Sequence, residues 1–124
     1  MDSSALIDWL NGVLPVAQLF DRLIQEGHTL AACPISIAEV YSGLAEDEWA
    51  IADPVLDALE YWDIDSLTAK QAGSYRYIYA RKGQPLSVPD TLMAALAVAK
   101  DATLITSNVR DFPMPELKLE PLPG

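Results

Sequence analysis

Apolar residues recur along the chain with the spacing of amphipathic helices, and short apolar runs of strand length lie between them. In one such segment Val16, Leu19 and Leu23 fall on the same helical face, and Gly27 follows as a typical helix stop. Periodicity and capping signals predict helices over residues 2–10, 16–25, 36–44, 47–60, 66–82 and 87–100. Strands are predicted over residues 29–32, 61–64 and 103–106, with an edge strand over 117–122.

Short strands that alternate with helices of this length require crossover connections. The pattern therefore predicts an α/β fold, in which helices flank a central parallel sheet. With 124 residues, of which 51% are hydrophobic, the chain is expected to form a single domain over 1–124 with a substantial core. No apolar stretch reaches the length of a membrane span and no secretory signal is visible, so we expect a cytoplasmic protein without a membrane partner.

The charge balance narrows the range of functions. Eighteen acidic residues against eight basic ones give a net charge of -10, which excludes a protein that coats nucleic acid nonspecifically. The stretch 66–89 has no acidic residue, however, and it carries Lys70, Arg76, Arg81 and Lys82. This stretch is either an ordinary solvated helix face or a local basic patch, interleaved with tyrosines, that contacts phosphates.

Two predicted helix starts share a pattern of serine, two residues and a carboxylate. It occurs from Ser36 to Glu39 and again from Ser87 to Asp90, and each occurrence alone is typical of a capping box. In an α/β sheet, helix starts lie just beyond the carboxyl ends of the strands, where such folds place their functional sites. Asp2, also at a predicted helix start, would join Glu39 and Asp90 at that edge.

Carboxylates gathered in this way would repel one another, because none of the three has a lysine or arginine within five positions. A bound cation would offset this repulsion. Ligands that are all oxygens select a hard divalent ion, Mg²⁺ or Mn²⁺, over zinc. Such ions activate water and neutralise phosphoryl charge, so hydrolysis of a phosphodiester is the chemistry that the pattern favours.

Four segments of the chain resemble motifs of the PIN-domain ribonucleases, and in particular the VapC toxins of bacterial toxin–antitoxin pairs. The first is similar to the opening of the family around its first acid, and the other three resemble its second, third and fourth motifs in order and spacing. These segments are Asp2-Ser3-Ser4-Ala5-Leu6-Ile7-Asp8, Ile35-Ser36-Ile37-Ala38-Glu39-Val40, Ser87-Val88-Pro89-Asp90-Thr91-Leu92-Met93-Ala94-Ala95 and Thr106-Ser107-Asn108-Val109-Arg110-Asp111-Phe112.

The resemblance implies a PIN-like fold and a Mg²⁺- or Mn²⁺-dependent endoribonuclease with a cognate antitoxin protein as its partner. Asp2, Glu39, Asp90 and Asp111 would be the metal-site residues, and Asn108 would complete the catalytic set. A toxin of this kind would hydrolyse RNA without a covalent intermediate. Contact with the RNA substrate would come from the basic residues Arg76, Arg81, Lys82 and Arg110.

The chain departs from the family at its beginning, because family members carry an apolar strand before the first acid and only Met1 precedes Asp2 here. The first strand of the sheet is therefore expected to be missing or shortened, or the chain starts upstream of Met1. Asp8 is a possible substitute for Asp2. A mean hydropathy of +0.14 on a small domain, together with the habit of the family, predicts a homodimer.

Two other classes of function remain open on the sequence. A metal-dependent phosphatase acting on small phosphate esters could use the same carboxylates. A catalytically inactive PIN-like binding module would be consistent with the missing strand. Cleavage of a labelled RNA, release of phosphate from a small ester and a metal titration distinguish the three possibilities.

Overall fold

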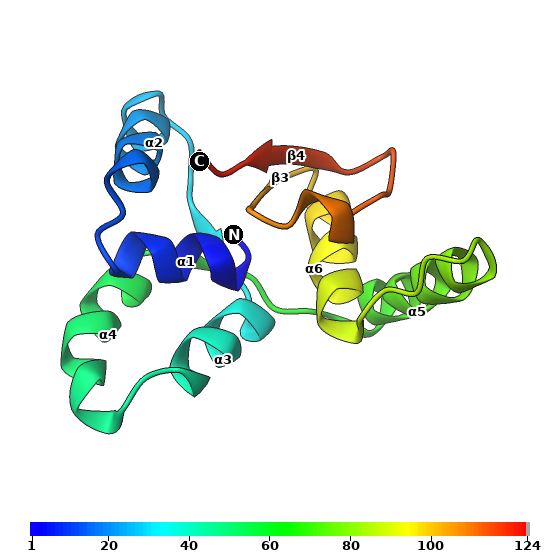
Figure 1. The fold of residues 1–124 in the computed structure, drawn as a ribbon, viewed down its shortest axis with the longest axis horizontal. Helices are drawn as coiled ribbons and strands as arrows, with labels where there is room; N and C mark the ends of the chain where they lie inside the picture. Colours follow the sequence, from blue (N-terminus) through cyan, green and yellow to red (C-terminus); the bar gives the residue numbers. More distant parts are fainter. Residues whose placement is uncertain (124) are drawn as a thin grey trace.

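The computed structural model describes residues 1–123 and places helices around short parallel strands (Figure 1). The elements follow one another as α1 (Ser3–Leu10), α2 (Leu14–Gln25), β1 (Ala31–Ala32), α3 (Pro34–Ser42), η1 (Glu46–Glu48), α4 (Trp49–Asp57), β2 (Glu60–Tyr61), α5 (Ser66–Arg81), α6 (Val88–Ala99), β3 (Thr103–Thr106), η2 (Val109–Asp111) and β4 (Lys118–Pro121), where η denotes a 3-10 helix. The predicted α/β class is confirmed.

The strands form two parallel pairs in place of one central sheet. β1 pairs with β2, and β3 pairs with β4, which follows the edge-strand prediction. The amino terminus connects the two pairs, because the Met1 amine donates to the Ala31 carbonyl at 2.9 Å and the Asp2 N–H donates to the Ile105 carbonyl at 3.2 Å. Met1 and Asp2 thus lie between the two strand pairs.

Several helix boundaries differ from the sequence prediction. α3 starts at Pro34, two residues earlier than expected, because proline fits the first turn of a helix, where its missing N–H is not needed. Its N-cap is Cys33, whose N–H donates to the Ser36 hydroxyl at 3.1 Å. The capping-box interpretation of Ser36 and Glu39 is therefore wrong, since Ser36 lies inside the first turn and Glu39 follows it one turn later.

Other boundaries agree closely with the sequence. α5 spans Ser66–Arg81 and stops before Gly83, whose φ of +79° is a conformation that favours glycine. α6 begins after Ser87, whose hydroxyl accepts a hydrogen bond from the Asp90 N–H at 3.2 Å. The capping role predicted for Ser87 is confirmed, and Asp90 occupies the third helical position.

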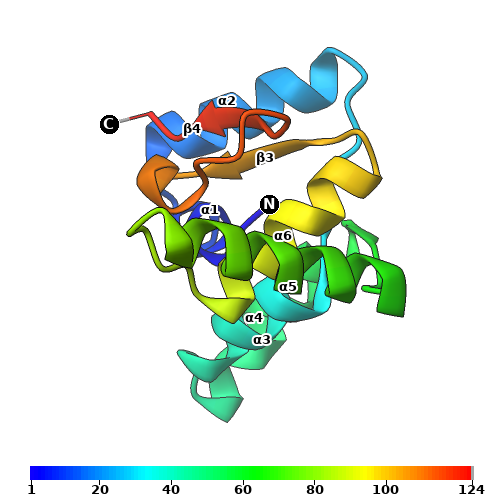
Figure 2. The same cartoon turned by 90° about the vertical axis from the view of Figure 1, so that its right-hand side faces the viewer.

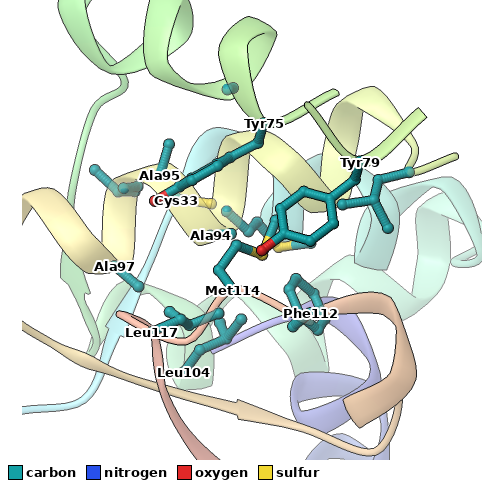
Figure 3. Close-up of a cluster of buried hydrophobic side chains, with 14 residues drawn as sticks. Cys33, Tyr75, Tyr79, Ala94, Ala95, Ala97, Leu104, Phe112, Met114 and Leu117 are labelled. Atoms are coloured by element: carbon teal, nitrogen blue, oxygen red, sulfur yellow. The ribbon is translucent and has the colours of Figure 1, made fainter. Parts of the chain in front are cut away.

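The largest cluster of buried side chains joins α5 and α6 to β3 and the carboxyl-terminal segment (Figure 3). Tyr75 and Tyr79 of α5 point toward this cluster, which includes Ala94 of α6 and Leu104 of β3, and Phe112 closes it from the loop after η2. Two smaller clusters lie around α1, one with α2 and β3 and the other with β1, α3 and α4. α1 is thus fixed on two sides.

α5 lies against α6 and projects from the rest of the molecule (Figures 1 and 2). Its outer surface leaves Leu67, Tyr77 and Ile78 exposed, with Leu67 at 76%. Among the helices of residues 1–123, none is long and apolar enough to cross a membrane.

Candidate active site

Asp2 is held in a fixed orientation at the start of α1. Its carboxylate caps the helix, accepting a hydrogen bond from the Ala5 N–H at 3.2 Å and one from the Ser4 hydroxyl at 2.6 Å, both on Oδ1. Its other oxygen, Oδ2, accepts a hydrogen bond from the Thr106 hydroxyl. Only 4% of Asp2 is exposed, so the side chain is buried but fully hydrogen-bonded.

The same hydroxyls connect Asp2 to the loop that follows β3. Thr106 accepts a hydrogen bond from the Asn108 N–H at 2.9 Å, and Ser4 accepts one from the Ser107 N–H at 3.3 Å. Thr106 is completely buried. The position of the loop that carries Asn108 and Asp111 is therefore coupled to the orientation of the Asp2 carboxylate.

Asp90 faces the same region from the first turn of α6. Burial raises the pKa of its carboxyl above the ordinary value, and the Ser87 hydroxyl partly opposes this shift. The negative charges of Asp111 and Asp2 also raise the pKa of Asp90, a smaller effect which indicates that both carboxylates lie near that of Asp90.

Asn108 is the N-cap of a single 3-10 turn, η2, directly after β3, and Asp111 is the last residue of that turn. Both are exposed, and the Asp111 N–H donates to the Asn108 carbonyl at 3.0 Å. Asp111 lies close enough to Asp90, in the first turn of α6, for its negative charge to act on the Asp90 carboxyl. Asp2 and Asp111 thus both lie near Asp90, and the role of these acids as metal-site residues stays a prediction.

Glu39 differs from the other three acids. It is exposed on α3, one turn beyond the position that the sequence assigned to it, and its own carbonyl accepts a hydrogen bond from the Ser42 hydroxyl at 2.7 Å. No effect of Glu39 on the pKa of Asp90 is found, in contrast to Asp2 and Asp111. The role of Glu39 as a metal ligand stays a prediction.

The chemistry of these donors fits a hard divalent cation. They are oxygens only, and no ion pair found within residues 1–123 involves Asp2, Asp90 or Asp111. Across this described part of the chain, no three Asp, Glu, His or Cys side chains are gathered tightly enough to hold a metal ion. A cation would therefore have to draw the acidic side chains together, and the exposed Asp111 and Glu39 are the ones free to move.

The predicted RNA-contacting residues divide into two sets. Arg76 donates from Nε to the Leu86 carbonyl at 3.0 Å, and Arg81 donates to the Tyr77 carbonyl while its guanidinium lies 3.2 Å above the Tyr77 ring. Nearer the acids, the Gln84 amide donates to the Arg110 carbonyl at 3.2 Å. The end of α5 that carries Arg81 and Lys82 therefore lies beside the loop that carries Arg110 and Asp111.

Sequence reasoning missed Ser4 and Thr106, the two hydroxyl residues that orient Asp2. Ser4 is two positions after Asp2, and Thr106 is the last residue of a predicted strand, two positions before Asn108. A short polar side chain at the end of a buried strand could have indicated such a contact, because a buried hydroxyl needs a hydrogen-bond partner.

Comparison with known proteins agrees with this architecture. The family model of the PIN domain matches residues 1–114. The chain belongs to the PIN-domain family. Among PIN-domain relatives, ribonuclease VapC19 of Mycobacterium tuberculosis is 31% identical over 119 residues, which cover 95% of each chain. Ribonuclease VapC2 of Rickettsia felis is 31% identical over 105 residues, covering 80% of this chain and 78% of the relative.

Solved structures of VapBC proteins share the PIN fold of this chain. The VapBC2 complex of Rickettsia felis bound to a DNA fragment from its promoter matches with a TM-score of 0.83 and 25% identity, over 98% of this chain and 96% of that one. The expected family, fold and VapC likeness are thus confirmed.

Proposed function

We propose that this chain is a Mg²⁺- or Mn²⁺-dependent endoribonuclease and the toxin component of a toxin–antitoxin pair. One observation carries the proposal: among residues 1–123 no ion pair involves Asp2, Asp90 or Asp111, and the negative charges of Asp2 and Asp111 both act on the Asp90 carboxyl. Such a cluster is unfavourable by itself and becomes favourable when a cation binds. The relatives named above are ribonucleases, which supports RNA as the substrate.

Each residue has a role that its position supports. Asp2 and Asp90 would hold the cation, with Asp111 and Glu39 moving toward it and Asn108 offering an amide beside Asp111. A divalent cation bound there would activate water and neutralise the charge on the scissile phosphate. Thr106 and Ser4 hold the Asp2 carboxylate in one orientation. Water has access to the site through the exposed side of Asp111.

Binding of the RNA backbone would fall to the basic residues around the carboxyl end of α5. Arg110 adjoins Asp111, and Arg81 and Lys82 lie next to the same loop through the hydrogen bond from Gln84 to Arg110. Arg76 is also exposed, but it lies five residues before Arg81 on α5 and donates a hydrogen bond to the Leu86 carbonyl. We therefore expect Arg110→Ala to weaken RNA binding more than Arg76→Ala.

A direct test is cleavage of an end-labelled RNA by the purified chain. We expect cleavage in Mg²⁺ or Mn²⁺ and none in excess EDTA, with activity restored when the ion is returned. A small phosphate ester serves as the second substrate. Turnover of the ester without cleavage of any RNA would contradict the ribonuclease and support the alternative that the sequence left open, a phosphatase.

The inactive binding module is a second candidate that one observation favours. Within the described residues no set of three ligands is already assembled, and Glu39 is exposed on α3. A titration with Mn²⁺ followed by calorimetry separates the two candidates. Saturable binding supports the enzyme, whereas the absence of binding at millimolar Mn²⁺ supports the module.

An antitoxin protein is the partner that the VapBC relatives indicate. Because the site is acidic, we propose that the antitoxin inserts an arginine or lysine toward Asp90 and Glu39 and competes with the metal ion. Inhibition that survives neutralisation of the antitoxin's basic residues would contradict this mode of binding.

We also propose a homodimer, which the exposed Leu67, Tyr77 and Ile78 on the outer surface of α5 support. A mass near 13.5 kDa by light scattering at all micromolar concentrations would contradict it. The cytoplasmic location expected from the sequence stays a prediction.

A further inference from the structure

A small groove lies beside α5, where the chain leaves that helix and turns back toward α6 (Figures 1 and 2). Its volume is about 280 Å³, close to the lower limit of roughly 300 Å³ for pockets that hold small ligands. Its lining consists of Gly73, Arg76, Tyr77, Ala80, Pro85 and Leu86. We call this space the α5 groove. It is distinct from the candidate active site, since its lining includes none of the acids of that site.

Small residues on one face of α5 leave the α5 groove open. Gly73, Tyr77 and Ala80 follow one another at spacings of four and three residues, so they lie on the same face of the helix. Because Gly73 and Ala80 have small side chains, the space between Tyr77 and the segment of Pro85 and Leu86 stays unfilled. A Cβ atom added at Gly73 would have no heavy atom within 4 Å. A ligand can therefore approach α5 closely at this position.

Arg76 gives the α5 groove a positive charge. Its Nε donates a hydrogen bond to the Leu86 carbonyl at 3.0 Å, which holds the guanidinium at the groove. No ion pair found within residues 1–123 involves Arg76, and the stretch 66–89 contains no acidic residue. The terminal nitrogens of a guanidinium carry four further N–H donors. The groove therefore suits a ligand with negative charge and hydrogen-bond acceptors.

Tyr77 adds an aromatic ring to the lining of the groove. The Arg81 guanidinium lies 3.2 Å from the centre of this ring and donates a hydrogen bond to the Tyr77 carbonyl at 3.1 Å. Arg81 thus covers one face of the ring, and Tyr77 is nevertheless 60% exposed. A second planar group can stack on the ring, as nucleic-acid bases do on aromatic side chains.

The α5 groove lies on a different side of α5 from the apolar residues Leu67 and Ile78. These two are 11 positions apart, about three helical turns, and so share one flank of the helix. At about 100° per residue, Ile78 lies about 140° around the helix from Gly73. A second copy of the chain seated on Leu67 and Ile78 would therefore leave the groove accessible.

A short stretch of chain connects the α5 groove with the acids of the candidate site. Leu86, which lines the groove, is four positions before Asp90, a span of at most about 14 Å along the chain. Gln84, directly before Pro85, donates a hydrogen bond to the Arg110 carbonyl next to Asp111. A single RNA strand with one phosphate at the acids can therefore reach the groove with a nearby nucleotide.

We propose that the α5 groove binds one unpaired nucleotide of the RNA, close to the phosphodiester that is cleaved. Its base stacks on Tyr77 above Gly73, and the Arg76 guanidinium donates hydrogen bonds to the same nucleotide. The aromatic ring and the apolar Pro85 and Leu86 favour a base over the phosphate backbone alone, because a base is planar and uncharged. This inference rests on RNA as the substrate of the proposed function, and it adds that the RNA is single-stranded beside the cleaved bond.

The test measures RNA binding by the full chain in excess EDTA and at low ionic strength, so that cleavage does not enter. The probe is a fluorescein-labelled pool of single-stranded RNA decamers of random sequence, followed by anisotropy. An abasic decamer with the same ribose-phosphate backbone is the reference probe. We expect the RNA to bind about tenfold more tightly than the abasic chain, because stacking of its base is lost in the latter. Equal affinity for the two probes, or no binding of either, would overturn the proposal.

Two variants of Tyr77 test the stacking. Tyr77→Ala should lose the preference for RNA over the abasic decamer, whereas Tyr77→Phe keeps the ring and should retain the preference. If Tyr77→Ala retained the full preference, the base would not stack on this residue and the proposal would be wrong.

A second pair of variants locates the site. Gly73→Leu fills the α5 groove and should abolish the preference for RNA without lowering the melting temperature, because it replaces a glycine within a helix. Ser74→Leu is the matched control, since Ser74 is exposed and does not line the groove, and it should retain the preference. A Gly73→Leu chain that kept the preference would overturn the proposal. A lower mass by light scattering for Gly73→Leu than for Ser74→Leu would also overturn it, because the groove would then hold a second copy.

Cleavage in Mg²⁺ or Mn²⁺ separates this inference from the function on which it rests. A chain that shows the base preference and its loss in Gly73→Leu, but cleaves no RNA, would support the groove and contradict the ribonuclease. A chain that cleaves single-stranded RNA with the same KM before and after Gly73→Leu would overturn the groove and leave the ribonuclease standing.

Discussion

The hydroxyl of Thr106 donates a hydrogen bond to the Asp2 carboxylate, and the two residues stand 104 positions apart in the chain. Thr106 is the last residue of β3, and Asp2 is the N-cap of α1. This contact therefore fixes the start of α1 against the end of β3 and sets the position of the first acid of the site.

Replacement of Thr106 by valine tests this relationship with little change of shape. Thr106→Val leaves one oxygen of a buried carboxylate without its donor, and we expect a loss of about 1 to 3 kcal/mol in the free energy of unfolding. Ribonuclease activity should fall as well, because the Asp2 carboxylate loses its fixed orientation. Urea unfolding and an RNA cleavage assay measure the two effects.

Thr106→Ser is the matched control, because it retains the hydroxyl and loses only a methyl group. It should recover most of the activity that Thr106→Val loses. If the serine and valine variants were equally inactive, the methyl group and not the hydrogen bond would be the important part of Thr106.

Helix starts could be predicted from the sequence where a capping residue is unambiguous. Ser87 caps α6 as expected, and this places Asp90 correctly at the third helical position. At α3 the prediction was wrong by two residues, because Pro34 outweighs Ser36 as a start signal. That shift moves Glu39 away from the helix start, so the error in one boundary carries over directly to one candidate site residue.

Contacts between distant parts of the chain lay beyond what the sequence could predict. The predicted strand over 103–106 was correct, but its pairing with β4 and the bonding of Asp2 to Ile105 depend on tertiary packing. The division of the sheet into two pairs depends on the same packing, in which Met1 bonds to Ala31 of β1 and Asp2 to Ile105 of β3. Motif spacing was enough to propose the acids of the candidate site, whereas the hydroxyls that orient Asp2 required the structure.

A second prediction concerns the alkaline limit of stability. Burial and the hydrogen bond to Asp53 raise the pKa of Tyr41 to about 12 in the folded protein, against 10.0 for a free phenol. The unfolded chain therefore loses its proton at a lower pH than the folded chain does. The stability that this group contributes is present below pH 10 and is lost as the pH rises toward 12.

Unfolding in urea at a series of pH values from 9 to 12 measures this effect. Tyr41→Phe should be less stable than the original chain at pH 9, and its free energy of unfolding should decline less steeply with pH above pH 10. Tyr75, whose pKa burial likewise raises to about 12, remains in that variant and accounts for part of the residual slope. An identical slope with and without the Tyr41 hydroxyl would contradict this assignment.

A third prediction concerns metal binding by the acids of the site. We expect millimolar Mn²⁺ to raise the melting temperature, because the ion binds the folded chain and relieves repulsion among Asp2, Asp90 and Asp111. The rise should disappear in excess EDTA. Asp21→Asn, a change at an exposed carboxylate on α2, should leave the shift intact and serves as the control. An unchanged melting curve in Mn²⁺ would count against the site.

The acid cluster makes a specific prediction about Asp90 itself. The raised pKa of Asp90 means that the folded chain binds this proton more readily than the unfolded chain. The ionised carboxylate therefore lowers stability as the pH rises through its pKa, and Asp90→Asn should remove that loss near neutral pH. If the Asp90 carboxylate only stabilised the first turn of its helix, its replacement would instead cost about 0.3 to 1 kcal/mol through the lost interaction with the helix dipole.

The most direct test of the proposed function is a parallel measurement of RNA cleavage and unfolding free energy for Asp90→Asn, with Asp21→Asn as the matched control. We predict that the Asp90 variant loses cleavage and most of its stabilisation by Mn²⁺ while its stability without metal holds or rises. A variant that is destabilised and still cleaves RNA at the rate of the original chain would show that Asp90 only stabilises the first turn of α6, and it would contradict the assignment of these acids as the active site.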